Sequence, residues 1–377
     1  MNQLQRTLFL LINSLFVAKY SLRFGLSPYI PVILYCFTII LIYFIVNKKI
    51  KYVSTRNSKL IFLLLFLFLL STILCLNYFI DPLKLQVDRW SAIHNFIHNL
   101  FHGIYPYAAH THLGGYGSPF PVWQAFHIPF YLLGNVGLGM FFAISCLGVF
   151  LIWYFENYLQ PIVFFIFMIA SPAFWYEVAV RSDLIYNFIF CLIAVVFLFK
   201  KNYSIQNKSV SIGVLSGLFL STRLSIFIPF AMFLFPGFLL SNLKSKFIFV
   251  LSAVLVFILT FLPFVFWDFH SLLFFKFNPF VLQTRQGSII EIILLLSMIY
   301  YFSGNWKNNI TLCSSYIAIT IVVFVTVTFC HRMISENFAN DLFSSSYDIS
   351  YFSMALPFVI FALTEFSPKY SADEKSN

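Results

Sequence analysis

The sequence predicts an all-α, polytopic membrane protein, and three observations lead to that fold class. Hydrophobic residues make up 60% of the chain, whereas charged residues make up 10%. Apolar runs of about twenty residues recur along the whole chain, which is the length that an α-helix needs to cross a bilayer. Lysines gather in a few connections between these runs, as the positive-inside rule requires of cytoplasmic loops. We therefore expect residues 1–377 to form a single integral-membrane domain.

A hydropathy window of about nineteen residues predicts about 11–12 transmembrane helices. The first is the weakest, because Lys19 and Arg23 lie at its end, so it could instead rest in the membrane interface as an amphipathic helix. A short polar cytoplasmic tail, residues 365–377, follows the last span. The predicted spans are residues 7–22, 28–46, 60–79, 136–154, 161–178, 184–199, 209–222, 224–241, 247–266, 288–303, 310–329 and 349–364.

The lysine-rich connections set the orientation of the chain. Those on the cytoplasmic side are residues 48–59, 200–208 and 244–246. Because successive spans alternate in direction, four connections are placed on the outer side: residues 80–135, 179–183, 267–287 and 330–348. We expect a multi-pass protein of a bacterial inner membrane, with its site on the outer side. The net charge of +10 follows from the cytoplasmic lysines, so no nucleic-acid partner is expected.

The longest outer connection, residues 80–135, holds six of the eight histidines and the carboxylates of Asp81 and Asp88. Its residues 88–102 have apolar side chains at helical spacing, which predicts an interfacial amphipathic helix, and a short re-entrant-like apolar segment follows. Asp88, at the start of that helix, has two interpretations. It could cap the helix, or it could act as a general base beside Arg89.

Histidines 94, 98 and 102 share one face of the predicted helix, at spacings of four residues. Such a stripe can bind a divalent metal, but it is more often a polar stripe that meets lipid headgroups or protein. His110 and His112 form a His-x-His step without an acidic partner beside it. A divalent metal therefore stays possible without a clear motif, and we predict no metal site and no required cofactor.

Arginine is preferred over lysine on the predicted outer side, where Arg89, Arg181, Arg223 and Arg285 lie. The planar guanidinium suits bidentate binding of phosphate or carboxylate, so this set predicts an anionic ligand at the membrane surface. Alternatively, each arginine pairs with an outer acid or reaches the lipid headgroups.

Aromatic residues in the same connection include Tyr105, Tyr107 and Trp123. Their rings could stack on a sugar, or they could anchor the protein at the interface without binding a ligand. We keep both interpretations for this cluster.

Several short motifs together resemble the GT-C superfamily of integral-membrane glycosyltransferases. An acid follows the exit from a long span, and an amphipathic helix and a Gly-x-Tyr-Pro-Tyr step come next. The remaining motifs are Arg181-Ser182-Asp183, Ser221-Thr222-Arg223, Asn278-Pro279-Phe280 and Tyr347-Asp348-Ile349. As an architecture, the resemblance covers most of the chain.

This resemblance implies transfer of a hexose, such as mannose, from a polyprenyl-phosphate donor to a lipid, glycan or protein acceptor. It implies Asp88 as the base that activates the acceptor hydroxyl, with Asp81 as the second choice. The donor phosphate would be bound by Arg181, Arg223 and Arg285, with Arg89 as a local partner. The residues implied in substrate binding are Tyr105, Tyr107, Trp123, Asp183 and Asp348. Membrane lipids, the donor and an unidentified acceptor are the expected partners.

The sequence also departs from the family pattern, and two other classes of protein stay open. The first outer connection lacks an Asp-x-Asp pair, since Asp81 and Asp88 are seven residues apart. A transporter or flippase for an anionic lipid could use Glu291 as a coupling carboxylate, although Glu291 could instead pair with Arg285. A membrane O-acyltransferase would need a histidine deep in a span, and His127 comes nearest.

Overall fold

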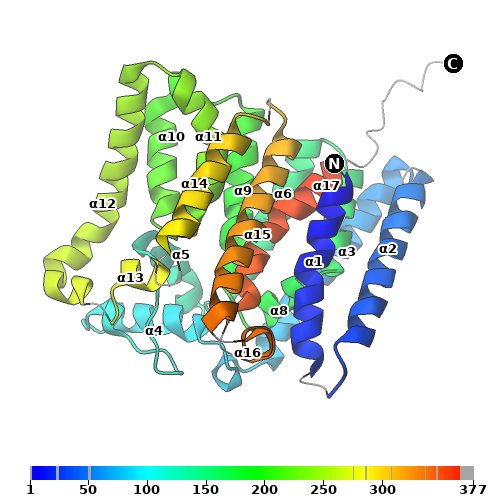
Figure 1. The fold of residues 1–377 in the computed structure, drawn as a ribbon, viewed down its shortest axis with the longest axis horizontal. Coiled ribbons are helices and arrows are strands. Elements are labelled where there is room, and N and C mark those ends of the chain that lie inside the picture. Colours follow the sequence, from blue (N-terminus) through cyan, green and yellow to red (C-terminus); the bar gives the residue numbers. More distant parts are fainter. Residues whose placement is uncertain are drawn as a thin grey trace. The chain divides into compact units, whose positions relative to one another are not determined.

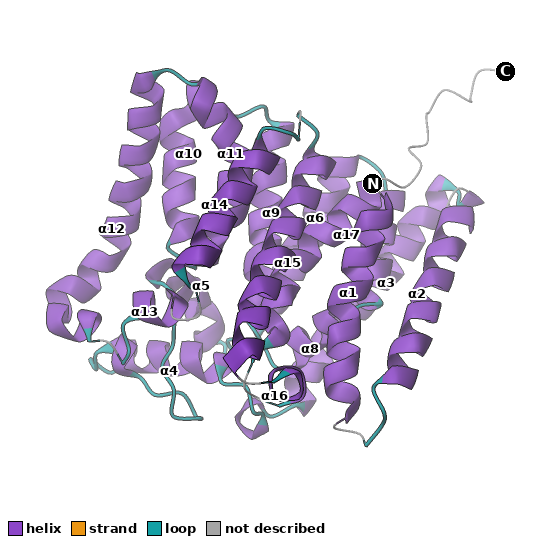
Figure 2. Ribbon diagram, viewed as in Figure 1, coloured by secondary structure: helices purple, strands orange, loops and turns teal. Residues whose placement is uncertain are grey.

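A computed structural model describes residues 2–22, 25–49, 52–274, 276–284, 287–306, 308–335, 337–344 and 347–365. These residues form α-helices, short 3-10 helices and connecting loops, and no strand occurs among them (Figure 2). The predicted all-α fold class is confirmed. The predicted polar tail lies outside the described residues from position 366 onward.

Each apolar segment predicted from hydropathy is helical in the structure, with ends that differ by several residues. The corresponding elements are α1 (Asn2–Ser21), α2 (Tyr29–Lys49), α3 (Thr55–Phe79), α6 (Leu138–Phe155), α7 (Leu159–Ile169), α8 (Pro172–Ala179), α9 (Leu184–Lys200), α10 (Ile205–Leu220), η5 (Leu224–Ile226), α11 (Phe227–Leu240), α12 (Leu243–Leu273), α14 (Ile289–Ser303), α15 (Ile310–Ser335), η6 (Ile349–Ala355) and α17 (Leu356–Glu365).

The lengths of these helices identify a multi-pass membrane protein. Five described helices, α2, α3, α6, α12 and α15, are long and apolar enough to cross a membrane alone. The bent pair of α7 and α8 makes a sixth if it counts as one span. Four more apolar helical segments, at α9, η5 with α11, α14, and η6 with α17, are 10–17 residues long. A straight crossing needs about twenty residues. Several of the predicted 11–12 spans thus correspond to helices that are shorter than this length.

The span predicted over residues 161–178 is bent, which corrects the prediction of one continuous helix. Helices α7 and α8 meet at an angle of 70°. Pro172 begins α8, where its missing N–H costs no helical hydrogen bond. The Oδ1 atom of Asn13, on α1, accepts from Ser171 Oγ at 2.6 Å and from the N–H of Ala173 at 3.1 Å. The apolar residues 161–178 gave no local sign of this break, because the side chain that holds it, Asn13, lies far away in the sequence.

The chain divides into two compact units, each built from separate parts of the sequence. Unit 1 contains Met1–Thr72, Ser145–Tyr176 and Asn309–Asn377, and unit 2 contains Ile73–Ile144 and Glu177–Asn308. The single domain predicted from hydropathy therefore has two compact parts. Unit 2 holds nearly all of the residues that the sequence nominates for a site.

Helix α1, whose role the sequence left open, belongs to unit 1 and buries one of its faces there. It packs against α2 and α17. Its Gln5 donates to Ser315 Oγ at 2.7 Å, and the ammonium of Lys19 donates to the carbonyl of Tyr347 at 2.8 Å. These buried polar contacts explain why hydropathy alone could not separate a span from an interfacial helix.

In unit 2, α10 and α12 pack against each other through glycine (Figure 1). A Cβ atom on Gly217 would lie 2.5 Å from the carbonyl oxygen of Ala253. A Cβ on Gly213 would lie 2.6 Å from the carbonyl oxygen of Phe249. Small residues four positions apart allow such close backbone approach between membrane helices. The turn that follows α10, residues 221–223, is also held to α12, since Ser221 Oγ lies 2.6 Å from Thr260 Oγ1.

Helix α4 (Arg89–Phe101) confirms the amphipathic helix predicted over residues 88–102. Its Ile93, Phe96 and Ile97 are buried, whereas His98 and Phe101 are exposed. The ring of Phe96 packs on Phe264 of α12, with the ring centroids 5.7 Å apart. Figure 1 shows α4 lying crosswise to the longer helices α10 and α12. The middle of α4 thus packs against α12, and Arg89 at its start bonds to Ser182, in the turn between α8 and α9.

We predict that Gly217→Ala lowers the thermal stability of the purified protein by about 1–3 kcal/mol, because the added methyl group meets a backbone carbonyl that cannot move alone. Gly237→Ala in α11 is the matched control, since a Cβ there meets no atom within 4 Å. The control should be neutral or slightly stabilising. Equal unfolding midpoints for both variants would show that the α10–α12 approach does not depend on glycine.

Candidate functional site

Four connections of unit 2 meet at one end, which we call the polar end. They are the start of α4, the α8–α9 turn at residues 180–183, the α10–α11 turn at residues 221–223, and residues 118–122, which lead into α5 (Pro121–Leu132). The first and last of them belong to the single connection 80–135 that the sequence nominated.

Hydrogen bonds to the backbone join these connections. The N–H of Phe120 donates to the carbonyl of Thr222 at 3.1 Å. Gln283 of α13 (Pro279–Thr284) donates to the carbonyl of Ser118 at 2.6 Å and accepts from the N–H of Leu224 at 2.7 Å. Because its amide both donates and accepts, Gln283 ties the segment before α5 to the start of η5.

The centre of the polar end is a buried ion pair between Asp183 and Arg223. Asp183 Oδ2 accepts from Arg223 Nε at 3.0 Å and from Nη2 at 2.5 Å. Asp183 is fully buried, and Arg223 is 8% exposed. The indole N–H of Trp123 donates to the same oxygen at 2.8 Å. Residues from α5, the α8–α9 turn and the α10–α11 turn therefore meet at one carboxylate oxygen.

The Asp183 carboxyl is ionised despite its burial. Burial raises its pKa, because a buried carboxylate loses its hydration. The positive charges of Arg223 and Arg89 and the hydrogen bond from Arg223 lower the pKa by more, so it lies below that of an ordinary aspartate. A charged pair, rather than a neutral acid, thus holds the polar end together.

Arg89 of α4 joins the same group. Its Nη1 donates to Ser182 Oγ at 3.0 Å, and its charge acts on Asp183. The Arg181-Ser182-Asp183 and Ser221-Thr222-Arg223 motifs, which the sequence placed in separate connections, are therefore brought together with α4.

Arg181, predicted to bind the donor phosphate, is directed at oxygens of the protein itself. Its Nη2 donates to the carbonyls of Asn77 and Ile80 at the end of α3, the second at 2.6 Å. Its Nη1 donates to Asn135 Oδ1 at 3.2 Å. Burial lowers its pKa, although the charge of Asp81 opposes that shift. This geometry makes Arg181 a structural clamp, and its predicted contact with the donor phosphate stays a prediction.

The backbone of Arg181 has an unusual conformation, which the clamp contacts of its side chain stabilise. Its φ angle of 51° lies in the left-handed region, at the position after a helix where glycine is common. The N–H of Ser182 bonds to the carbonyl of Glu177, which closes α8. A non-glycine residue in this region costs roughly 1–2 kcal/mol, which the buried guanidinium contacts offset.

The acids of the predicted outer connections fall into two classes. Asp81 caps η3 (Pro82–Lys84), where its Oδ1 accepts from the N–H of Leu83 at 3.0 Å. Asp348 caps η6 of unit 1 and accepts from the N–H of Ser350 at 2.9 Å. These two carboxylates have local structural roles, as aspartates at helix starts commonly do.

Asp88 and Asp183 also stand at helix starts, before α4 and α9, but neither side chain caps its helix. Asp183 binds Arg223, as described. Asp88 Oδ2 instead accepts from Thr111 Oγ1 at 2.8 Å. The capping interpretation of Asp88 is therefore not what the structure shows, and the general-base interpretation stays a prediction.

Aromatic residues predicted to bind substrate differ in exposure. Tyr107 is 1% exposed, and its ring packs between Phe96 and Phe264. Trp123 is buried, and its indole N–H donates to Asp183. Tyr105 is half-buried near Trp267, and burial and the charge of Asp268 raise its pKa. Tyr105 alone of the three keeps a partly open ring, so it is the one best placed to touch a ligand.

The histidine stripe of α4 forms a stack of rings. The ring centroids of His94 and His98 lie 6.4 Å apart, and those of His98 and His102 lie 4.0 Å apart. Within the described part of the chain, no three histidine, cysteine, aspartate or glutamate residues are grouped so that they could hold a metal ion.

His127 is part of a chain of hydrogen bonds behind Trp123. Its Nδ1 lies 2.6 Å from the Trp123 carbonyl, which only accepts, so Nδ1 carries the proton. Its Nε2 then accepts from the Tyr186 hydroxyl at 2.5 Å. Burial lowers the pKa of His127 to about 4, so the ring is neutral at pH 7. Both nitrogens have partners within the protein, which does not favour the acyltransferase alternative.

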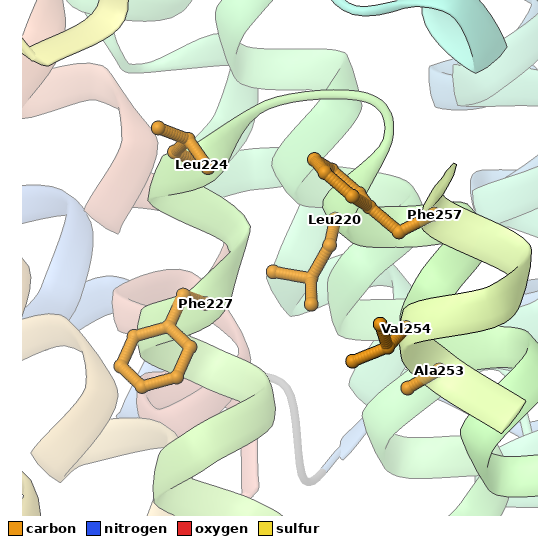
Figure 3. Close-up of a pocket in the computed structure, with 6 residues that line it drawn as sticks. All are labelled: Leu220, Leu224, Phe227, Ala253, Val254 and Phe257. Carbon is orange, nitrogen blue, oxygen red and sulfur yellow. The ribbon is translucent and has the colours of Figure 1, made fainter. Parts of the chain in front are cut away.

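An apolar cavity of about 430 Å³ adjoins the turn that carries Arg223 (Figure 3). Leu220 precedes this turn and Leu224 follows it. Figure 3 shows these two side chains with Phe227 of α11 across from residues of α12. The α12 residues that complete the lining are Ala253, Val254 and Phe257. An apolar space thus lies beside the turn that carries the buried Arg223.

Two further sequence predictions need comment. Arg285 lies outside the described residues, so its predicted phosphate contact stays a prediction. Glu291 is buried and accepts from the N–H of Ser288, while Ser288 Oγ accepts from the N–H of Glu291 at 3.4 Å. This reciprocal capping gives Glu291 a role at the start of α14.

Sequence reasoning missed Thr111 and Gln283. Each is a single uncharged residue with no periodic partner, and its importance comes only from what lies across from it. The Gly114-Gly115 pair was the one available signal, since it indicates a tight turn close to Thr111.

Comparisons with protein-family models, with curated proteins and with solved structures find no match to this chain.

We predict that Asp183→Asn lowers the free energy of unfolding by about 3–5 kcal/mol, because it leaves Arg223 buried without a counter-charge. Arg223→Met in the Asp183→Asn background should cost much less than it does alone, and a double-mutant cycle of denaturant unfolding measures this coupling. Asp81→Asn, at an exposed cap, is the control and should cost little, because asparagine caps a helix about as well as aspartate. Additive losses for the pair would contradict the coupling.

We also predict an acid-dependent loss of stability that His127 causes. In the unfolded chain this histidine titrates near pH 6.5, whereas its pKa in the folded protein is about 4. As the pH falls from 6.5 towards 4, only the unfolded state takes up the proton, so the free energy of unfolding decreases by up to ~3 kcal/mol. His127→Gln should flatten the stability curve in this window. Parallel curves for variant and wild type would refute this assignment.

Proposed function

We propose that this protein is a membrane glycosyltransferase that moves a sugar from a polyprenyl-phosphate donor to a lipid, glycan or protein acceptor. The observation that carries the proposal is the juxtaposition at the polar end of unit 2. Arg89 and Arg223 gather around Asp183, and an apolar cavity adjoins the turn of Arg223. A ligand with an anionic head and a long apolar chain matches that combination.

The arginines would bind the donor phosphate in this proposal. Arg223 uses Nε and Nη2 for Asp183, which fixes the plane of the guanidinium and leaves Nη1 outside the pair. Such a preorganised donor stabilises charge that develops on a leaving phosphate without reorganising. Arg89 would act beside it from α4. The cavity next to Leu224 would take the first isoprene units of the chain.

Asp88 would be the base. It adjoins Arg89, and its Oδ2 is held by Thr111. In a direct displacement, Asp88 takes the proton of the acceptor hydroxyl as the acceptor oxygen bonds to the anomeric carbon. The bond from that carbon to the phosphate oxygen breaks, and the electron pair leaves with the polyprenyl phosphate.

A transporter or flippase of an anionic lipid would also use arginines beside an apolar cavity. That alternative needs a coupling carboxylate, and Glu291 caps α14 instead. The structure offers no observation that favours transport over transfer, so transport enters as an outcome of the test.

The test is sugar transfer from radiolabelled polyprenyl-phosphate sugars to endogenous acceptors in membranes that contain matched amounts of protein. We expect transfer by the wild type with at least one donor and better use of long than short isoprenoid chains. Asp88→Asn should lower the rate by about 10²–10⁴, because it removes the base. Asp81→Asn tests the second candidate base, and with Asp88 as the base it should leave the rate within about threefold, because it changes only an exposed cap.

Equal transfer by Asp88→Asn and wild type would remove Asp88 from the mechanism. Loss of transfer in Asp81→Asn alone would make Asp81 the base. Absence of transfer with every donor, combined with movement of a labelled anionic lipid across proteoliposomes, would replace the proposal with transport.

A further inference from the structure

The loop between η4 (Pro106–Ala108) and α5 folds back on itself as a small hairpin at residues 110–116. His110 and Tyr116 pair as an isolated antiparallel bridge. The N–H of Thr111 donates to the carbonyl of Gly115 at 2.8 Å, and the N–H of Gly115 donates to Thr111 Oγ1 at 3.0 Å. Gly114 supplies the turn with a φ angle of 82°, which suits glycine. The hairpin thus fixes the Thr111 side chain from its own backbone.

The hairpin is fastened to the first turns of α4. Asn95 donates to the carbonyl of His110 at 2.8 Å, and the N–H of His112 donates to Ser91 Oγ at 3.1 Å. Gly117 follows so closely that a Cβ there would lie 3.2 Å from the carbonyl oxygen of Ala92. Ser91 and Asn95 of α4 therefore hold the hairpin next to the start of that helix, and Ala92 packs closely against the residue that follows it.

Thr111 is the point at which this assembly reaches Asp88. It is 5% exposed, and its hydroxyl donates to Asp88 Oδ2 at 2.8 Å while it accepts from Gly115. A Cβ on Gly115 would lie 3.1 Å from the same carboxylate oxygen. Among the described residues, Thr111 is the hydrogen-bond donor that the structure gives to the Asp88 side chain. Asp88 Oδ1 is left for another partner.

Asp88 breaks a local rule to make this contact. It precedes α4, but its backbone has φ −99° and ψ 6°, and its carboxylate does not cap the helix. Asp81 and Asp348 do cap the helices that follow them. A side-chain cap is worth about 1 kcal/mol, so Asp88 lacks a stabilising bond that Asp81 and Asp348 make. Natural proteins make such exceptions mainly at functional sites.

We propose that Thr111 is a positioning residue, which fixes the Asp88 carboxylate so that Oδ1 receives the proton of the acceptor hydroxyl. The proposal rests on the glycosyl transfer proposed above. Thr111 holds Oδ2, and Oδ1 takes the proton as the acceptor oxygen bonds to the anomeric carbon. The bond from carbon to phosphate breaks, and the phosphate keeps the electron pair. Thr111 itself neither gains nor loses a proton in the reaction.

The experiment compares Thr111→Val, Thr111→Ser and Asp88→Asn with the wild type by sugar transfer from the polyprenyl-phosphate donor that the wild type uses. Valine keeps the shape of threonine without the hydroxyl, whereas serine keeps the hydroxyl. We expect Thr111→Val to lower kcat by about 10–100-fold with KM changed by less than about threefold, because a misdirected base affects the reaction more than binding. Thr111→Ser should return kcat to within about threefold of wild type.

Folding and generic effects are controlled separately. Thermal unfolding and the amount of protein in the membrane are measured for every variant. Thr38→Val serves as the matched control, since Thr38 is exposed on α2 and its hydroxyl donates to the carbonyl of Leu34 in the same helix. It should leave kcat unchanged.

The outcomes separate the two proposals. If Asp88→Asn abolishes transfer but Thr111→Val has wild-type kcat, the positioning role is overturned and the glycosyltransferase proposal stands. A loss in Thr111→Val that Thr111→Ser does not restore would also overturn it, because packing and not the hydroxyl would be the cause. If the wild type transfers no sugar, or Asp88→Asn stays active, the proposed function or its base fails and the role of Thr111 fails with it.

Discussion

Asp183 and Arg223 are both withdrawn from solvent, and each compensates for the charge of the other. A buried carboxylate without a counter-charge would be too costly. The ionised Asp183 therefore requires that the α10–α11 turn, which carries Arg223, lies against the α8–α9 turn. The indole N–H of Trp123 donates to the same carboxylate, and this hydrogen bond positions α5. Much of the polar end of unit 2 follows from this one requirement, since three connections share a single oxygen atom.

Arg181, Arg223 and Arg89 look alike in the sequence, but the structure gives them different partners. Arg181 binds backbone carbonyls at the end of α3, where partial negative charge gathers, and so it ties helices together. Arg223 is oriented by a carboxylate, and Arg89 approaches from α4 through Ser182. Guanidinium groups held in this way are preorganised, which is the property that phosphate recognition needs. Arg181 is therefore part of the scaffold, whereas Arg223 and Arg89 lie at the candidate site.

The helices follow from local sequence with few exceptions. Apolar runs predicted them, and the amphipathic pattern of residues 88–102 predicted α4. The exceptions arise where a distant side chain decides the backbone: Asn13 holds the bend at Ser171. The sequence predicted the residue types of the candidate site, and the pair of Asp183 with Arg223 is the alternative given there, in which an outer arginine pairs with an outer acid. Thr111 was missed, because a single hydroxyl in a loop has no pattern of its own.

The sequence by itself determined the fold class, the helices and the connection that holds most of the polar chemistry, because hydrophobicity and its spacing are local properties of the chain. Tertiary structure alone decided which acid caps a helix and which is turned away from it. Asp81 and Asp88 look alike in the sequence, but one accepts from the N–H two residues on, and the other from Thr111, 23 residues away. Hydrogen bonds of that range depend on how the hairpin rests on α4, and no local pattern encodes this.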